Sequence, residues 1–324
     1  MSHDEIVQRQ RELLESLLIE RQISGYIAWY YTPMAREFSN HLHPGAVIYD
    51  CMDELSAFAG APPTMRANEQ DLFDSADLVF TGGASLYEAK RQQHRSVYQF
   101  ASSVDVAHFV RARVVKKEPE DQSGIPRPRI GYAGVIDERM DIALLDKAAE
   151  LRPGWQFVLL GPVLKIDPAT LPKRANIHYL GMKAYQDLPA YFGGWDIGML
   201  PFALNESTRY ISPTKTPEYL AAGLRVISTP IRDVVTSYGD LELVGIVKNA
   251  GDFVRIADFM LHSPFNSAFQ GRADAFLSQS SWDGTWSGMN QLIEEVLSSK
   301  GLSAVRAGRA ASFPAMAMKG AAHV

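Results

Sequence analysis

Apolar residues recur along the chain with two spacings, one typical of an amphipathic helix and one typical of a short buried strand. Near the N-terminus, leucine and isoleucine follow one face of a helix that we predict over residues 4–22. Short apolar runs then alternate with helical segments as far as residue 100. The pattern predicts strands at 26–31, 46–50, 77–81 and 97–100, with helices at 69–76 and 84–94. Such alternation predicts a parallel sheet with helices on its faces.

A second series of the same kind begins at residue 129, after a charged, proline-containing stretch that is poor in apolar residues. It predicts strands at 129–134, 155–161, 177–181, 196–201, 225–229 and 243–248, and helices at 140–152, 188–193, 217–222, 252–261 and 281–298. The fold class that follows is α/β, with two Rossmann-like domains. We expect a first domain over 1–110, a linker over 111–128, a second domain over 129–298 and a disordered tail over 299–324.

The stretch over residues 212–230 predicts a loop, a short helix and a buried strand. Thr216 suits the helix cap and Gly223 suits the left-handed position after the helix. The free N–H groups of a first turn favour phosphate, and Lys215 adds a positive charge there. Glu218 can accept hydrogen bonds from the vicinal hydroxyls of a ribose. The stretch therefore predicts a nucleotide-sugar site, although the same residues also fit an ordinary helix start.

Composition narrows the class of protein. The chain has 324 residues, a net charge of −5 and one cysteine, Cys51. The single cysteine excludes a disulfide framework, and the negative charge argues against a general nucleic-acid binder. The N-terminal segment is a charged helix rather than an apolar leader, and no apolar run is long enough to span a membrane. We expect a cytoplasmic protein.

Five stretches in order carry a family resemblance. They are IGYAG at 130–134, FVLLG at 157–161, NIHYLG at 176–181, DIGMLP at 196–201 and PTKTPEYLAAG at 213–223. Together they resemble the donor-binding domain of GT-B glycosyltransferases of the group 1/family 4 kind. YDCMD at 49–53 and SVDVAHF at 103–109 resemble the end of the acceptor-side domain of that family. The resemblance covers residues 25–295 and implies the GT-B architecture.

The resemblance also implies site residues. Glu218 matches the second glutamate of the family's Glu-x7-Glu signature, which meets the donor ribose, while Tyr210 stands where the first would fall. The stereochemistry of the reaction is therefore left open. Lys215 resembles a phosphate-contacting lysine, and Gly134 matches the glycine turn under the diphosphate. The full donor-binding set is Gly134, Arg139, Gly181, Arg209, Tyr210, Thr214, Lys215 and Glu218.

The chain departs from the family at its start. A first domain of a GT-B enzyme opens with a strand and a glycine turn, whereas this chain begins at a later helix. The first domain is therefore expected to be shortened. The leucine stripe of residues 4–22 is expected to cover the sheet of its own domain, with a protein partner or the membrane surface as alternatives.

The chemistry expected of such an enzyme needs no metal. No Asp-x-Asp pair occurs, and the histidines lack metal-ligand spacing. Basic residues would stabilise the leaving diphosphate, and Lys215, Arg209 and Arg139 are the candidates. An inverting reaction also needs a base. The candidates are the acidic residues after the predicted strand at 46–50, namely Asp50, Asp53 and Glu54, and their alternative is a solvated loop or helix cap.

The function expected is that of a glycosyltransferase. It would move a hexose from a nucleotide-sugar donor to a polysaccharide or glycolipid acceptor of the cell envelope, with no cofactor and no nucleic-acid partner. A peripheral attachment to the inner face of the membrane, or to a protein partner, is a further expectation. The alternatives are a non-catalytic sugar-nucleotide-binding or partner module with a degenerate fold, and a nucleotide-sugar epimerase.

Overall fold

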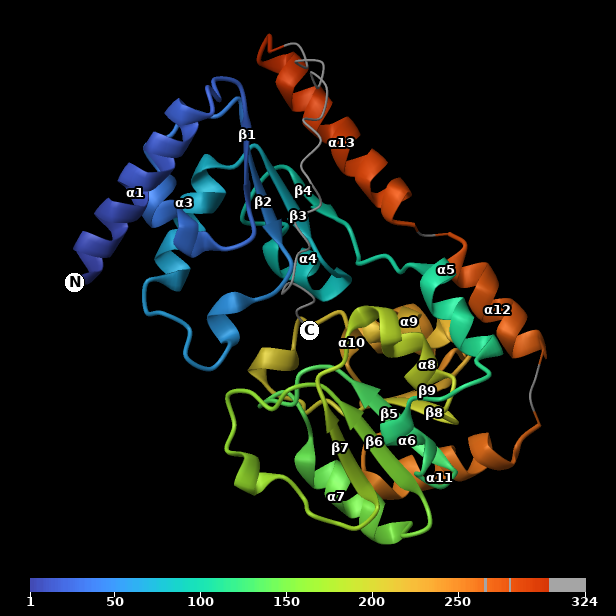
Figure 1. Cartoon of the computed structure of the whole chain (residues 1–324). Coiled ribbons are helices and arrows are strands. Elements are labelled where there is room, and N and C mark those ends of the chain that lie inside the picture. The colour runs from blue at the N-terminus through green and yellow to red at the C-terminus, as the bar shows by residue number, and fades with distance from the viewer. Residues whose placement is uncertain (265–266, 280, 303–324) are drawn as a thin grey trace. The chain divides into compact units, whose positions relative to one another are not determined.

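The computed structural model describes residues 1–264, 267–279 and 281–302, so most of the predicted tail lies outside the described residues. The chain forms two compact units (Figure 1). Over the described residues, one unit consists of Met1–Ala101 together with 285–302, and the other of Ser102–Gly284. The prediction of two α/β units, each with its own sheet, is confirmed.

The first unit is built on a four-stranded parallel sheet, counted over the described residues, in the order β1-β2-β3-β4. Its strands are β1 (Ile27–Tyr30), β2 (Ala46–Cys51), β3 (Leu78–Thr81) and β4 (Val97–Gln99). Its helices are α1 (His3–Glu20), α2 (Arg36–Ser39), α3 (Met65–Ser75), α4 (Ala84–Lys90) and nearly all of α13 (Trp282–Ser299). All four strands lie where the apolar runs predicted them.

The two faces of this sheet have different partners, because successive side chains of a strand point to opposite sides. Ile48 of β2 packs with Leu78 and Phe80 of β3 against Ile293 of α13. Asp50 lies two residues further along β2 and therefore shares that face. The α13 helix, which the chain supplies last, thus completes the core of the first unit.

The opposite face holds a buried ionic cluster, here called the Lys90 cluster, made of Lys90, Glu54, Glu69 and Tyr49. The ammonium of Lys90 lies 2.7 Å from a carboxylate oxygen of Glu54 and 2.8 Å from one of Glu69. The hydroxyl of Tyr49 donates to Glu69 at 2.8 Å. Burial lowers the pKa of Lys90, but its hydrogen bonds to the two glutamates outweigh burial and raise it overall. The cluster ties the loop after β2 to α3 and α4.

Helix α1 lies against α2 rather than on the sheet, which differs from the expectation. The guanidinium of Arg11 donates to the carbonyl oxygen of Glu37 at 3.2 Å and to the side chain of Asn40 at 3.0 Å. These polar contacts and the half-buried Val7, Leu14 and Leu18 hold the helix, while Leu13 and Leu17 stay exposed. Within the described part of the chain, no helix combines the length and apolar character that crossing a membrane requires.

The second unit has a six-stranded parallel sheet, again over the described residues, in the order β10-β9-β8-β5-β6-β7. Its strands are β5 (Arg129–Ala133), β6 (Gln156–Leu160), β7 (Ile177–Gly181), β8 (Ile197–Leu200), β9 (Arg225–Ser228) and β10 (Val244–Ile246). Its main helices are α7 (Ile142–Leu151), α8 (Leu188–Phe192), α9 (Lys215–Ala221), α10 (Arg232–Val234), α11 (Ala250–His262) and α12 (Ser267–Leu277). The chain winds outward from β5 in one direction and from β8 in the other, and ligands of such sheets bind beyond the carboxyl ends of the strands at this switch point.

The stretch predicted as a linker, 111–128, packs on the second unit instead. It follows α5 (Val106–Phe109) and contains α6 (Glu120–Ser123). The buried side chain of Gln122 donates to the carbonyl oxygen of Tyr191 at 3.0 Å and accepts from the indole of Trp195 at 2.9 Å. The stretch is therefore anchored to the second unit by its buried residues, Ala112, Gln122 and Ile125, although most of its other side chains are exposed.

Candidate functional site

The predicted donor helix is α9, and it begins at the carboxyl edge of the second sheet. Strand β8 ends at Leu200, and α9 then returns the chain to the start of β9. The hydroxyl of Tyr219, a fully buried residue, accepts a hydrogen bond from the backbone N–H of Ala133 at 2.7 Å. That bond joins α9 to the end of β5. The first turn of α9 therefore lies beside the glycine turn at Gly134.

The start of α9 differs from the prediction by two residues. The helix begins at Lys215 with Thr214 in the cap position, and Thr214 makes no capping hydrogen bond through its side chain. Thr216 is instead buried in the first turn, and its hydroxyl has no hydrogen-bond partner. The predicted left-handed residue at the other end is confirmed, since Gly223 has a φ of 83°.

The first turn of α9 contains an ion pair between Lys215 and Glu218, in which only one oxygen of the Glu218 carboxylate has a partner. The ammonium of Lys215 lies 3.0 Å from one oxygen of Glu218, and both side chains are largely buried. The other carboxylate oxygen of Glu218 is buried and has no hydrogen-bond partner. Burial raises the pKa of Glu218, while the charge of Lys215 acts in the opposite direction. Buried acceptors are rarely left unpaired, so this oxygen is available to a ligand hydroxyl.

Three glycines end neighbouring strands beside α9. The backbone N–H of Gly134 donates to the carbonyl oxygen of Leu160, and that of Gly161 donates to the carbonyl oxygen of Gly181, each at 2.9 Å. Two of the predicted donor residues, Gly134 and Gly181, are thus joined through Gly161. This third glycine was not predicted as a site residue, although it closes one of the five family-like stretches.

Replacing Gly161 by alanine is expected to disturb the glycine turn directly. Its φ is 139°, and an added Cβ would overlap the carbonyl oxygen of Gly134, so the backbone must shift. We expect a loss of stability of about 1–3 kcal/mol, measured by urea unfolding. The matched control is Gly154→Ala, because no atom lies within 4 Å of a Cβ at that position. Equal stability of the two variants would contradict this account.

The arginines of the predicted donor set are held by other groups. The guanidinium of Arg139 chelates the buried carboxylate of Asp137, with nitrogen to oxygen distances of 2.7–3.1 Å. Arg209 is exposed, lies 5.2 Å from the centre of the Tyr210 ring and 3.6 Å from Glu206. Arg139 therefore has a fixed position near the turn after β5, whereas Arg209 and Tyr210 form a separate surface pair.

Two aromatic residues next to Glu218 were not predicted as site residues. The rings of His108 and Tyr185 stack with 4.2 Å between their centres and 10° between their planes. Burial, followed by the negative charges of Glu218 and Asp105, raises the pKa of Tyr185 to about 12. This coupling indicates that Tyr185 faces Glu218. The sequence signal was present for His108 alone, because it belongs to the family-like stretch at 103–109.

The three predicted base candidates lie in different surroundings in the first unit. Asp50 is 4% exposed, one of its carboxylate oxygens accepts from the indole of Trp29 at 3.1 Å, and the other has no partner. Burial raises the pKa of Asp50 to about 6, although the Trp29 hydrogen bond acts in the opposite direction. Glu54 belongs to the Lys90 cluster, and Asp53 lies partly exposed in the loop after β2. Only Asp50 among the three combines burial with an unpaired carboxylate oxygen.

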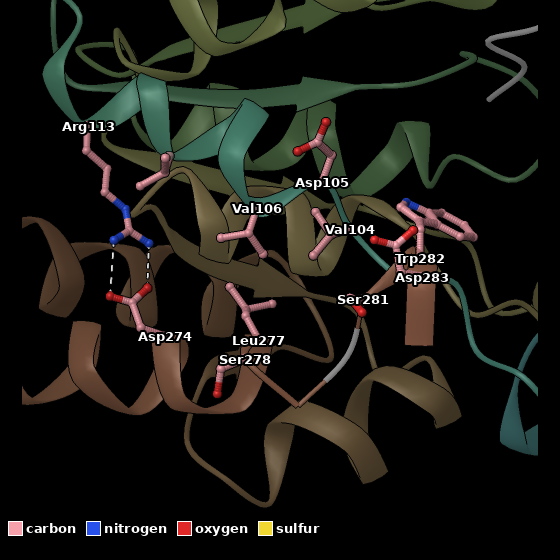
Figure 2. A pocket seen from close by; sticks show the side chains of 11 residues that line it. Val104, Asp105, Val106, Arg113, Asp274, Leu277, Ser278, Ser281, Trp282 and Asp283 are labelled. Carbon is pink, nitrogen blue, oxygen red and sulfur yellow. Dashed lines mark hydrogen bonds and ion pairs between the residues drawn. The ribbon is translucent and has the colours of Figure 1, made fainter. Parts of the chain in front are cut away.

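A further pocket, of about 690 Å³, lies wholly within the second unit and contains no predicted site residue (Figure 2). Val104, Val106 and Leu277 give it an apolar wall, and Trp282 stands at one side. At the other side, Arg113 and Asp274 form a two-pronged ion pair with distances of 2.6 and 3.1 Å. Over the described residues, no three His, Cys, Asp or Glu side chains gather closely enough to hold a metal ion.

Comparison with known proteins places this geometry in context. No family model matches the chain. Over 216 residues it is 25% identical to TuaH of Bacillus subtilis strain 168, whose name describes a glycosyltransferase of teichuronic acid biosynthesis. The match covers 62% of this chain and 54% of TuaH, so the chain spans about half the length of this curated relative.

Solved structures agree with the predicted architecture. The sucrose-phosphate synthase of Thermosynechococcus elongatus superposes with a TM-score of 0.70 at 13% identity, over 92% of this chain and 81% of that chain. HepE of Anabaena, solved in complex with UDP-glucose, gives 0.60 at 17% identity over 82% and 75% of the two chains. The chain therefore has the two-domain fold of GT-B glycosyltransferases, as the sequence predicted.

Proposed function

We propose that this protein is a nucleotide-sugar-dependent glycosyltransferase of the hexosyl-transferring kind. The observation that carries the proposal is the unpaired, buried carboxylate oxygen of Glu218, held beside Lys215 at the switch point of the second sheet. A carboxylate can accept hydrogen bonds from the ribose hydroxyls of a nucleotide, and a cation beside it can bind the phosphates. The likeness to TuaH supports glycosyl transfer, and the likeness in fold to HepE, solved with UDP-glucose, supports a uridine donor.

The donor would lie across the carboxyl edge of the second sheet. In this proposal Glu218 accepts hydrogen bonds from the ribose, Lys215 contacts the diphosphate, and the turn at Gly134 allows the diphosphate to approach the backbone. Arg139 stands near the same turn, where its charge can stabilise the leaving group. The stacked rings of His108 and Tyr185 border this site on the side of Glu218.

The transfer itself forms a bond between an acceptor oxygen and the anomeric carbon of the donor sugar. The bond from that carbon to the diphosphate breaks, and the diphosphate leaves with the electron pair. The proton of the acceptor hydroxyl needs a recipient, and in an inverting reaction Asp50 is the candidate base. The acceptor we propose is a cell-envelope polysaccharide or glycolipid, and the likeness to TuaH, named for teichuronic acid biosynthesis, supports an acceptor of this class.

Loss of either member of the Lys215–Glu218 pair is expected to weaken donor binding. Lys215→Ala and Glu218→Gln each remove a charge-assisted hydrogen bond, which is typically worth about 1.5–3 kcal/mol or roughly 10–150-fold in Kd. Isothermal titration with UDP measures this directly. The matched controls are Lys147→Ala and Glu150→Gln, because that pair has the same three-residue spacing on α7 but is exposed.

The titration also tests the proposal as a whole. The wild type should bind at least one of UDP, GDP and TDP, and it should release the free diphosphate nucleotide from the matching sugar nucleotide when an acceptor is present. A wild-type protein that binds none of these nucleotides would contradict the proposed function. Unchanged UDP affinity in both site variants would instead show that the site has been placed wrongly.

A further inference from the structure

Three exposed or half-buried aromatic rings lie close together in the first unit, and the central one is hydrogen-bonded to Asp50. Trp29 lies centrally, with its ring centre 6.4 Å from that of Tyr31 and 6.2 Å from that of Trp286. Tyr31 is 64% exposed and Trp286 is 53% exposed. Tyr31 directly follows β1, Asp50 lies in β2, and Trp286 belongs to the first turns of α13. We call Trp29, Tyr31 and Trp286 the aromatic shelf.

The shelf is coupled to the buried carboxylate. The indole of Trp29 donates to one oxygen of Asp50 at 3.1 Å, which fixes both the ring and the carboxylate. The other oxygen of Asp50 has no partner, although it is buried. An unpaired buried acceptor is costly, so a ligand that donates a hydrogen bond there would gain affinity. Large apolar side chains exposed together indicate a binding surface.

The angles between the rings decide what kind of ligand fits. The plane of Trp29 makes 37° with that of Tyr31 and 31° with that of Trp286, so neither outer ring stands upright against the indole of Trp29. An aromatic cage for a cation needs walls that stand around the charge. A shallow shelf instead matches the flat, C–H-bearing face of a pyranose ring, whose hydroxyls project at its edge.

We propose that the aromatic shelf binds a pyranose ring of the acceptor and directs one of its hydroxyls to the free oxygen of Asp50. This assignment rests on the proposed function, because a glycosyltransferase is what gives the first unit an acceptor sugar to bind. It goes further by naming the acceptor class as a pyranoside, and by naming Tyr31 and Trp286 as residues that bind it. The shelf lies within the first unit alone and is separate from the pocket of Figure 2.

The test is direct binding of simple sugars to the full chain. Saturation-transfer NMR with methyl glucoside, galactoside, mannoside, N-acetylglucosaminide and glucuronide should show binding of at least one pyranoside to the wild type. Trp286→Ala and Tyr31→Ala should each weaken that binding at least tenfold and leave UDP affinity unchanged. Trp286→Tyr keeps an aromatic ring and should retain binding, which separates loss of the shelf from loosening of α13.

Matched controls come from the same elements. Trp282→Ala removes a tryptophan of the same 53% exposure one turn earlier in α13, and Tyr98→Ala removes a partly exposed tyrosine from β4. Both should bind the pyranoside as the wild type does. Loss of binding in Trp282→Ala with retention in Trp286→Ala would place the sugar in the pocket of Figure 2 and overturn the proposal.

Other outcomes would overturn the proposal as well. Full binding in both Trp286→Ala and Tyr31→Ala, or displacement of the pyranoside by tetramethylammonium, contradicts a sugar shelf. A wild type that binds UDP but no pyranoside contradicts the shelf and leaves the proposed function standing. A wild type that binds a pyranoside through Trp286 but no nucleotide supports the shelf and contradicts the proposed function.

Discussion

Asp50→Asn is expected to lower the rate of sugar transfer by roughly 10²–10⁴-fold, the usual contribution of a general base. Asparagine keeps the shape of the side chain and an acceptor for the indole of Trp29, but it cannot take a proton. The affinity for UDP should not change, because the proposed donor site lies in the other unit. Transfer is measured as release of UDP that depends on the acceptor, with UDP titration on the same samples.

Although Asp50→Asn should lose activity, we expect it to be more stable than the wild type at neutral pH. Burial raises the pKa of Asp50 to about 6, above the value of about 4 expected in the unfolded chain. The stability that protonated Asp50 contributes is therefore complete below pH 4 and is lost as the pH rises through 6. At pH 7.5 the wild type has lost about 2–3 kcal/mol that asparagine would not lose. Asp50→Asn should unfold at higher urea than the wild type at pH 7.5, with no difference near pH 4.

Asp74→Asn serves as the control, since Asp74 is an exposed residue of α3 whose carboxylate contacts Gln70. It should leave both transfer and stability as they are in the wild type. The assignment of the base would be wrong if Asp50→Asn kept full transfer activity while Asp53→Asn or Glu54→Gln lost it. A wild-type pH profile of transfer without an acidic limb near 6 would also contradict it.

Lys90→Met is expected to destabilise the first unit by about 3–5 kcal/mol, which is the usual cost of removing one partner of a buried ion pair. Methionine fills a similar volume but leaves Glu54 and Glu69 without the cation that lies 2.7–2.8 Å from them. Two neighbouring buried carboxylates would then repel each other. Urea unfolding at pH 7.5 measures the loss.

Arg91→Met is the matched control for the Lys90 cluster. Arg91 follows directly in sequence and also contacts a glutamate, Glu88 at 2.9 Å, but both side chains are about half exposed. Exposed pairs of this kind contribute at most about 1 kcal/mol. If Lys90→Met cost no more than Arg91→Met, the cluster would not hold the loop after β2 as described.

The strands could be predicted from sequence because each is a short apolar run, and most of these runs are bounded by Gly, Pro or Asp. Every strand predicted in the two series is present, with ends that differ by one or two residues. The switch point in the second sheet could not be predicted, since strand order depends on pairing between residues far apart in the chain. That order is what places α9 beside Gly134.

The differences share a physical cause. The linker was predicted for 111–128 from its charge and prolines, yet Gln122 bonds inside the second unit and Arg113 pairs with Asp274 of α12. Helix α12 itself was not predicted, although Phe269, Ala273, Phe276 and Leu277 have helical spacing and pack on the core of the second unit. The capping role of Thr216 failed for a similar reason, since tertiary contacts bury that side chain. Composition describes a segment in isolation. The 111–128 stretch, helix α12 and the side chain of Thr216 instead depend on burial or on contacts with residues more than 50 positions away.

The acidic loop after β2 shows what sequence could and could not resolve within the site. The sequence gives no basis for choosing the base among Asp50, Asp53 and Glu54. The structure separates them, because Asp50 is buried and Glu54 pairs with Lys90. The aromatic shelf could not be predicted from the sequence, because Trp286 follows Trp29 by more than 250 residues. Only the packing of α13 on the first sheet brings the two rings together.

The return of α13 to the first unit has a consequence for how the protein is made. A ribosome completes Met1–Ala101 early, but it must add all of Ser102–Gly284 before the covering helix emerges. At roughly 5–20 residues per second, the face formed by Ile48, Leu78 and Phe80 stays open to chaperones and other nascent chains for roughly 10–40 s. The second unit is continuous and can fold during that interval. The unit that is translated first is therefore the last to be finished.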